Sequence, residues 1–391
     1  MTRKKIVYIQ HAPSLGGSVV SLKELIIDAK KNGYECAVIC PNQAIADFYS
    51  VLGVKTYVAV IAPFNHNTAY FYKFTFREAL RVIKLMLKTI VSFFFLFKIL
   101  RKEKPHMVHL NSSTLIGYTI YCWILKIPNL LHVRETIVSG YTGFRKRIII
   151  WMANRFANAT IFISEFEYER LPTNTKNSFV IYNYVHKDEF LAVEQITPQD
   201  SNRFRLVILG GLFRLKGGNV LLKALVDLDD NVELLVLGGD DPRNHPGEIQ
   251  RVDGVHYLDE VIQLLNHSAI GKKVKFIGKV PKPQQYIASA DALIFWAASP
   301  HFPRPVFEAW LLKKPVLYHN PGYQNEIVDS GNVINISSSQ TQELTSKIRL
   351  LKDQEYTGDL IERSFAAAIN NFTEKNFDKI NFLYKQCLIK Y

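Results

Sequence analysis

The stretch LVILGGLFRLKGGNVLLKA, residues 206–224, says more about this chain than any other. Its apolar start, residues 206–209, predicts a buried strand, and two glycines then end that strand. Arg214 and Lys216 follow in the turn, and the glycine pair 217–218 opens an amphipathic stretch that predicts a helix. Such a turn can hold a phosphate, because glycine lets the backbone approach and a helix N-terminus offers unpaired N–H groups. Taken alone, the segment could equally be a solvated basic turn.

Segments that predict strands alternate with segments that predict helices along the whole chain, as in parallel α/β sheets. The first series of predicted strands comprises residues 5–10, 34–40, 107–111, 130–135 and 160–164. The second series comprises residues 206–209, 232–239, 274–280, 292–298 and 315–320. Between the two series, residues 191–204 are polar and without periodicity, which predicts a linker.

The predicted fold is therefore α/β, with two doubly wound, Rossmann-like domains. We expect the first domain over residues 1–195 and the second over residues 196–372, followed by a terminal segment, residues 373–391. In open sheets of this kind, ligands bind beyond the carboxyl ends of the strands. Two such domains facing each other would enclose a cleft, which is a favoured site for small molecules.

Composition narrows the classes of protein. The chain has 391 residues, too many for one ordinary core, and 48% of them are hydrophobic, as in globular proteins. A net charge of +13 suits an anionic partner, but no basic tract with interleaved aromatic residues predicts nucleic-acid binding. The cysteines lack metal-site or paired spacing, and the basic start of the chain is too poor in apolar residues for a signal peptide. These features predict a protein of the reducing cytoplasm.

The most apolar stretch, residues 82–100, is interrupted by lysines and is too short between them to span a bilayer. Arg77, Arg81, Lys84, Lys88 and Ser92 recur at helical spacing, so they predict a basic face on an otherwise apolar helix. Two interpretations stay open. The helix lies in the interface of an anionic membrane, which would make the protein peripheral on the cytoplasmic leaflet, or its apolar side packs on the sheet.

The order of these pieces resembles glycosyltransferase family 4, the retaining, sugar-nucleotide-dependent enzymes of the two-domain GT-B fold. Each motif alone is weak, but the correct order of all of them over nearly the whole chain is specific. The motifs are Gly16-Gly17, PHMVHLN (105–111), HVRE (132–135), ISEFEYERL (163–171) with VIYNYV (180–185), LGGLFRLKGG (209–218), VKFIGKVPKPQQYIASADALI (274–294) and SPHFPRPVFEAWLLKKPVL (299–317). The end of the chain resembles the terminal helix that crosses back to the first domain.

The resemblance implies roles for donor binding. Lys216, with Arg214 beside it, would hold the nucleoside diphosphate, and Glu308 would accept hydrogen bonds from the ribose hydroxyls. The resemblance also places Arg304 at the donor, and Gly16-Gly17 would let the diphosphate or acceptor approach the backbone of the first domain. Fixed cations can stabilise the charge of a departing diphosphate without a metal or a cofactor. For Glu308 the alternative is a residue favoured by a helix N-terminus.

Three departures from the family pattern affect this assignment. Pro300 stands where the family usually has a first glutamate that touches the donor sugar. Pro303 replaces a usual glycine, and with Pro305 it removes two backbone donors. Gly211 replaces the arginine that usually lies five residues before the lysine, and Arg214 is the proposed substitute.

His132, Arg134 and Glu135 end a strand of the first domain, so they are candidates to position the acceptor hydroxyl or to steady the departing phosphate. A structural salt-bridge cluster is the alternative. His109 is more typical of a satisfied core histidine, and the DxD spacing of residues 227–229 is more typical of a solvated turn than of a metal site. The glycine pair 238–239 either borders the nucleotide or forms only a turn.

Three functions follow as hypotheses. The first is a metal-independent hexosyltransferase that moves a sugar from a nucleoside diphosphate sugar to a hydroxyl of a glycan, lipid-linked, in cell-surface polysaccharide synthesis. The second, motivated by Pro300, is a GT-B-shaped binding or scaffold protein without turnover. The third is an epimerase that acts on a sugar nucleotide without an acceptor.

Overall fold

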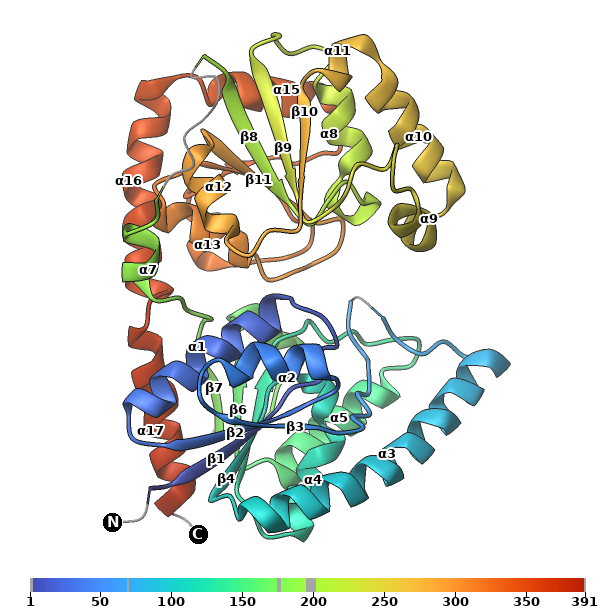
Figure 1. The fold of residues 1–391 in the computed structure, drawn as a ribbon, viewed down its shortest axis with the longest axis vertical. Coiled ribbons are helices and arrows are strands. Elements are labelled where there is room, and N and C mark those ends of the chain that lie inside the picture. The colour runs from blue at the N-terminus through green and yellow to red at the C-terminus, as the bar shows by residue number, and fades with distance from the viewer. Residues whose placement is uncertain (1–2, 69, 174–176, 195–201, 390–391) are drawn as a thin grey trace. The chain divides into compact units, whose positions relative to one another are not determined.

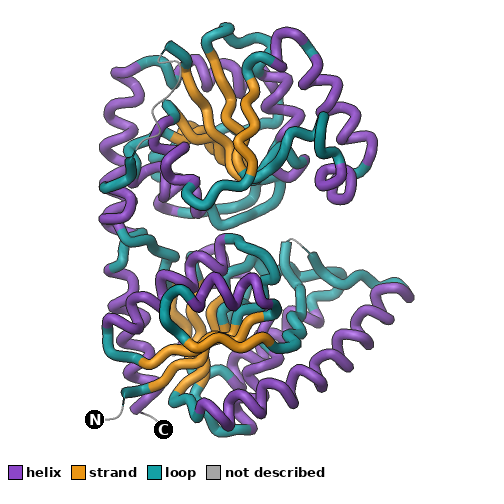
Figure 2. The backbone as a smooth tube through the Cα atoms, in the orientation of Figure 1, coloured by secondary structure: helices purple, strands orange, loops and turns teal. Residues whose placement is uncertain are grey.

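The computed structural model describes residues 3–68, 70–173, 177–194 and 202–389. The chain forms two compact units, and each is described by itself (Figures 1 and 2). Unit 1 contains residues 1–185 and 374–391, and unit 2 contains residues 186–373. The domain boundary expected between residues 195 and 196 lies outside the described residues and stays a prediction.

Unit 1 is built on a seven-stranded sheet of order β3-β2-β1-β4-β5-β6-β7, in which every described pair is parallel. Its strands are β1 (Lys5–Ile9), β2 (Glu35–Cys40), β3 (Lys55–Val58), β4 (Met107–Leu110), β5 (Asn129–Val133), β6 (Ala159–Phe162) and β7 (Ser178–Val180). Its α-helices are α1 (Gly17–Lys31), α2 (Gln43–Ser50), α3 (Phe76–Glu103), α4 (Gly117–Ile124), α5 (Phe144–Phe156), α6 (Glu165–Arg170) and α17 (Lys375–Ile389).

Helices cover both faces of this sheet because neighbouring strand residues point to opposite sides. Ile6 and Tyr8 of β1 pack in one core with α1, α2 and α17, whereas Val7 and Ile9 pack in a second core with α3, α4 and α5 (Figure 1). The terminal helix α17 thus completes the core of unit 1.

Unit 2 is built on a parallel six-stranded sheet of order β10-β9-β8-β11-β12-β13. Its strands are β8 (Phe204–Leu209), β9 (Val232–Leu237), β10 (Val274–Gly278), β11 (Ala292–Trp296), β12 (Val316–His319) and β13 (Ile334–Asn335). Its α-helices are α7 (Lys187–Leu191), α8 (Gly218–Ala224), α9 (Gly247–Asp253), α10 (Val255–Asn266), α11 (Ser268–Gly271), α12 (Pro283–Ser289), α13 (Arg304–Leu311), α14 (Glu326–Asp329), α15 (Thr341–Leu350) and α16 (Gln354–Asn371).

The predicted pair of Rossmann-like domains is confirmed. In each sheet the strand order reverses at one point, between β1 and β4 in unit 1 and between β8 and β11 in unit 2. Ligands of doubly wound sheets bind beyond the carboxyl ends of the strands at such a switch point. Each unit therefore has one place where a ligand is expected.

Candidate functional site

The turn after β8 has the strand, turn and helix that residues 206–224 predict. Gly210 and Gly211 both adopt positive φ angles, 95° and 77°, which glycine tolerates without strain. Arg214–Lys216 form a single 3-10 turn, and α8 begins at Gly218. The turn lies at the switch point of unit 2, where the backbone N–H of Ala298, just beyond β11, donates to the carbonyl of Leu215 at 2.9 Å.

Two pairs of glycines bring the ends of β8 and β9 together. A Cβ on Gly238 would lie 3.2 Å from the Cα of Gly210, and a Cβ on Gly239 would lie 2.9 Å from the Cα of Gly211. Side chains at these positions would force the ends of β8 and β9 apart. Beside this glycine seam lies a cavity of about 460 Å³, lined by Leu212, Phe213, Gly239, Asp240 and residues 244–249. Of the glycine pair 238–239, Gly239 thus lines a cavity as well as part of the bend after β9.

Lys216 is a half-buried cation. The aliphatic part of its side chain lies against Gly210, since a Cβ added to Gly210 would be 3.3 Å from the Lys216 Cε. The Lys216 Nζ lies 5.7 Å from the ring centroid of Phe295. Desolvation lowers the pKa of Lys216. Among the described residues, no carboxylate forms an ion pair with its Nζ. A desolvated ammonium group without a counter-charge favours an anionic ligand.

Arg214 points to a different neighbour. Its guanidinium carbon lies 4.9 Å from the ring centroid of Tyr257, and its backbone N–H donates to Asp253 at 2.9 Å. The Tyr257 hydroxyl donates to the Leu212 carbonyl at 2.9 Å and accepts from the backbone N–H of Asn219 at 3.2 Å. The two cations of the turn therefore rest on separate aromatic rings, and Tyr257 ties both ends of the turn together.

Glu308 and Arg304 form an ion pair within α13. The Arg304 Nε donates to the Glu308 Oε1 at 2.7 Å, and the two side chains are only 15% and 13% exposed. Glu308 is the fifth residue of this helix, beyond the first turn in which the helix dipole acts most strongly. The Glu308 carboxylate is therefore held by its arginine partner rather than by the end of the helix.

The first turn of α13 has few free amides. Pro303 is the N-cap residue and Pro305 lies inside the first turn, so neither has an N–H. The N–H of Arg304 donates to Phe302 at 3.1 Å, and that of Val306 donates to Pro303 at 2.9 Å. This helix start is therefore poorly equipped to bind a phosphate.

In unit 1, the candidates His132 and Arg134 lie next to each other at the end of β5. His132 is buried, and its Nδ1 lies 3.3 Å from the Nη2 of Arg134. The Arg134 Nε donates to the Asn111 Oδ1 at 2.8 Å, and its Nη1 donates to Asn183. This guanidinium is held by amide oxygens and an imidazole at the switch point between β1 and β4.

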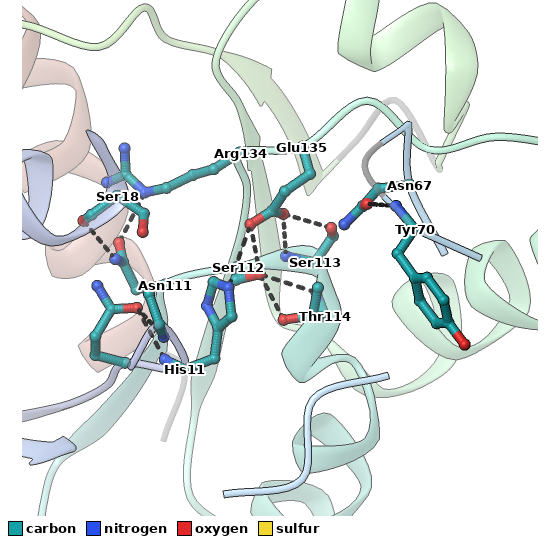
Figure 3. A network of polar contacts seen from close by, with 12 residues as sticks. His11, Ser18, Asn67, Tyr70, Asn111, Ser112, Ser113, Thr114, Arg134 and Glu135 are labelled. Atoms are coloured by element: carbon teal, nitrogen blue, oxygen red, sulfur yellow. Dashed lines mark hydrogen bonds and ion pairs between the residues drawn. The ribbon is translucent and has the colours of Figure 1, made fainter. Parts of the chain in front are cut away.

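Glu135 is held separately, and Figure 3 shows that its side chain and that of Arg134 leave the backbone in different directions. Its Oε1 accepts from the Ser112 hydroxyl at 2.7 Å, and its Oε2 accepts from the backbone N–H and hydroxyl of Ser113 at 3.1 and 2.6 Å. The Nε2 of His11 lies 4.0 Å from the same Oε1. Ser112, Ser113 and His11 belong to this cluster, although no motif in the sequence singled them out.

The other candidates are placed as follows. Gly16 is the N-cap of α1, and a Cβ on Gly16 or Gly17 would have no atom within 4 Å, so space is open beside the loop. His109 is buried and bonded to other side chains. Asp229 of the DxD spacing is exposed and pairs with Lys352 at 2.7 Å, as expected of a solvated turn.

Helix α3 has three faces. Leu96, Leu100 and Ser92 face the core, and the Ser92 hydroxyl is 2.7 Å from that of Tyr118, so Ser92 does not lie on the basic face where the spacing placed it. The apolar side chains at 40–80% exposure are Phe76, Leu80, Ile83, Met86, Leu87, Ile90, Val91, Phe94 and Phe95. Arg77, Lys84 and Lys88 are also exposed, whereas Arg81 is paired with Glu78. The interpretation in which the apolar side packs on the sheet therefore accounts for only part of this helix.

None of the helices among the described residues combines the length and the apolar character that crossing a bilayer requires.

Comparisons with known proteins agree with this architecture. Residues 15–189 match a family model described as Glycosyltransferase Family 4, and residues 191–366 match one described as Glycosyl transferases group 1. None of the curated proteins matches the chain.

Solved structures show the same fold at low sequence identity. Anabaena HepE in complex with UDP-glucose is similar at a TM-score of 0.75 and 18% identity, covering 99% of this chain and 100% of that one. Sucrose-phosphate synthase from Thermosynechococcus elongatus is similar at a TM-score of 0.72 and 17% identity, covering all of both chains. WaaG, a glycosyltransferase involved in lipopolysaccharide biosynthesis, is similar at 0.62 and 13%, covering 96% and 98%.

Proposed function

Since this chain is a glycosyltransferase of the GT-B fold and the family 4 type, we propose that it moves a hexose from a nucleoside diphosphate sugar to a hydroxyl of a glycan. The observation that carries the donor assignment is Lys216, a desolvated cation at the switch point of unit 2 that pairs with no carboxylate in the described part of the chain. The proposed reaction retains the anomeric configuration and uses no metal. Lys216 and Arg214 then neutralise the charge that develops on the leaving diphosphate.

In this proposal the nucleoside binds in the cavity beside the glycine seam. The cavity is lined by Gly239 and by Leu212 and Phe213, which directly precede the turn that carries Lys216, so a ligand in it would lie next to that turn. Glu308 would accept from the ribose hydroxyls with the carboxylate oxygen that Arg304 does not hold. HepE is named as a complex with UDP and with UDP-glucose, which supports a nucleotide-sugar donor and makes UDP the first probe.

Nucleotide titration calorimetry tests the donor assignment. We expect one of UDP, GDP or CMP, or one of their sugars, to bind, and Lys216→Ala to weaken that binding more than Arg214→Ala. Loss of a charge-assisted hydrogen bond costs about 1.5–3 kcal/mol, or roughly a 10-fold to 150-fold loss of affinity. The matched control is Lys223→Ala, which removes an exposed lysine of α8 that is paired with Glu260. Unchanged affinity in Lys216→Ala would remove the phosphate assignment.

Unit 1 supplies the acceptor side of the proposal. Arg134 and Glu135 lie at the carboxyl edge of its sheet, each fixed by hydrogen bonds that prevent large excursions. Groups held in this way can orient an acceptor hydroxyl, and orientation contributes much of the rate in transfer reactions. WaaG is described as acting in lipopolysaccharide biosynthesis, which supports a glycan acceptor, and we propose a lipid-linked one in cell-surface polysaccharide synthesis.

A lipid-linked acceptor fits the exposed side of α3. The side chains of residues 76, 80, 83, 87, 90 and 94 are spaced alternately by four and three, so they form one straight apolar stripe. Arg77, Lys84 and Lys88 flank the stripe, while the acidic residues of the helix, Glu78 and Glu103, are buried. An exposed apolar stripe with basic flanks fits an anionic membrane interface.

Helix α5 repeats this pattern on the same face of the sheet. Phe144, Ile148 and Trp151 are exposed at spacings of four and three, and Trp123 of α4 is 50% exposed. Tryptophan is enriched where protein meets the interface of a membrane. A second copy of this chain is a poorer occupant, because two α3 helices would bring basic flanks together without acidic partners.

Liposome sedimentation tests the membrane proposal. We expect the protein to bind vesicles that contain anionic lipid and not to bind neutral vesicles. Salt should weaken this binding. Changing Arg77, Lys84 and Lys88 to Gln removes about 3 kcal/mol at roughly 1 kcal/mol per basic residue, a loss of about 100-fold. The control changes three exposed lysines of α17, Lys375, Lys379 and Lys385, to Gln. Equal binding to both vesicle types, or a concentration-dependent dimer without vesicle binding, would overturn the proposal.

A binding protein without turnover is the second candidate, favoured by the amide-poor start of α13 and by Pro300. It predicts nucleotide binding without release of nucleoside diphosphate, even with acceptor extract present. An epimerase would instead convert the donor without any acceptor. Measurement of nucleoside diphosphate release with and without acceptor separates all three.

A further inference from the structure

A buried chain of polar groups runs through unit 1 from the terminal helix to Arg134. The Tyr384 hydroxyl of α17 is 2.8 Å from the Nδ1 of His109, and the His109 Nε2 is 3.2 Å from the Nδ1 of His132. The same His132 Nδ1 is 3.3 Å from the Arg134 Nη2, and the Tyr8 hydroxyl is 3.4 Å from that of Tyr384. Tyr8, His109, His132 and Tyr384 are at most 2% exposed.

The protons of these hydrogen-bonded groups can be placed one after another, starting at Arg134 and ending at Tyr384. A guanidinium only donates, so the Nδ1 of His132 must offer its lone pair. His109 then carries its proton on Nε2 and donates to that same Nδ1. Burial first, and then the charge of Arg134, lower the pKa of both histidines, so both are neutral near pH 7. The Nδ1 of a neutral His109 is therefore an acceptor, and the Tyr384 hydroxyl donates to it.

This arrangement leaves one group unsatisfied. The proton of neutral His132 is on Nε2, and that atom is buried without a hydrogen-bond partner among the described residues. The other tautomer would place a proton between the His132 ring and two donors, Arg134 and His109. The observed contacts therefore fix the tautomer even though one N–H stays unpaired.

We propose that Tyr384 is a positioning residue for Arg134. By donating to the Nδ1 of His109, it keeps the His109 proton on Nε2 and directed at His132, so that the His132 Nδ1 presents its lone pair to the guanidinium. Arg134 is thereby held toward Asn111 and Asn183 at the edge where the acceptor is proposed to bind. The terminal helix is thus part of the acceptor site. This inference rests on the proposed function only for the consequence in catalysis, not for the tautomers.

Without the Tyr384 hydroxyl, His109 can move its proton to Nδ1. The His109 Nε2 then carries a lone pair that faces the lone pair of the His132 Nδ1, so the hydrogen bond between the two rings is lost. The charged group that faces this pair among the described residues is Arg134, whose contacts include Asn111, Asn183 and His132. Protonation of His132 at low pH would break the contact with Arg134 from the other side. Both changes act on the guanidinium and not on the donor site.

Selective ¹⁵N-histidine NMR of the full chain tests the tautomers without any substrate. We expect His132 and His109, assigned by single replacement with Gln, to be neutral with the proton on Nε2 between pH 6 and 8. In Tyr384→Phe we expect His109 to show a proton on Nδ1. A proton on Nδ1 of His132 in the wild type would overturn the proposal, as would an unchanged His109 in the variant.

Kinetics test the consequence. We expect Tyr384→Phe to lower kcat about tenfold and to leave the KM of the donor unchanged. We also expect the acidic limb of the pH–activity profile to shift to higher pH. The matched control is Tyr34→Phe, which removes a buried hydrogen bond of 2.9 Å to Asn381 on the same helix without touching the histidines. Equal losses in both variants would show a merely structural role and overturn the positioning role. If the wild type has no transferase activity, the proposed function fails while the NMR result still decides the tautomers.

Discussion

Replacement of Tyr257 by Phe isolates one hydroxyl that closes the cationic turn of unit 2. The ring is retained, so its packing in the core and its stacking with Arg214 stay in place. Two backbone groups lose their partner: the carbonyl of Leu212, at 2.9 Å, and the N–H of Asn219, at 3.2 Å. Asn219 lies in the first turn of α8, where the N–H has no partner within the helix.

The expected cost follows from these two groups. Tyr257 is 1% exposed, so water cannot readily replace its hydroxyl. A buried backbone group left unsatisfied costs about 1–3 kcal/mol, and two of them that share one lost partner cost about 2–4 kcal/mol. For a unit of this size, each kcal/mol lowers the melting temperature by about 2–4 °C, which gives a shift of about 4–16 °C.

Calorimetric melting with and without UDP measures this shift. Under the proposed donor assignment, the transition that UDP raises is that of unit 2, because a ligand stabilises the unit it binds. The control is Tyr356→Phe, which changes an exposed tyrosine of α16. A shift below about 2 °C, or the same shift in the control, would refute the claim that this hydroxyl ties the turn together.

Three further predictions concern single side chains. Gly217→Ala should lower the melting temperature of unit 2 far more than Gly247→Ala, because Gly217 has a φ of 66° and a Cβ would lie 2.6 Å from the Trp296 ring, whereas a Cβ at Gly247 meets nothing. Burial raises the pKa of Glu167 to about 7, so the folded state favours its protonated form and the free energy of unfolding falls as pH rises from about 4.5 to 7. Glu167→Gln should abolish that fall, worth about 3 kcal/mol, in denaturant titrations over this range, and a persistent slope would contradict the assignment. Wild-type protein should bind UDP about tenfold more tightly than 2′-deoxy-UDP, whereas Glu308→Ala should bind both alike, and equal discrimination by the two would exclude ribose recognition by Glu308.

Much of the fold could be predicted because buried parallel strands are continuous apolar runs. The strand at residues 292–296, ALIFW, is of this kind. The strands β3 and β7 were missed, because they are short edge strands whose residues are only partly buried. Their sequences, KTYV and SFV, carry too few residues for a period to be detected.

The candidate site was predictable only where its chemistry is local. The turn from Gly210 to Gly218 is contiguous, so its glycines and cations could be found together. The partners of Arg134 come from residues 111 and 183, and no pattern joins such distant positions before the chain folds. For helix α3 the sequence left two interpretations open, because the helix is apolar on two sides and hydrophobicity alone cannot tell which of them packs on the sheet.

The position of α17 in the chain bears on synthesis. Phe377, Ile380, Leu383, Tyr384 and Cys387 belong to the same core as β1, β2 and α1. While the ribosome is still making unit 2, the first 185 residues therefore lack part of their hydrophobic core, whereas unit 2 is contiguous in the sequence. We therefore expect unit 1 to be completed after unit 2, the reverse of the usual order in which the N-terminal domain folds first. Since helix α17 also carries Tyr384, the proposed acceptor side of unit 1 is incomplete until α17 docks.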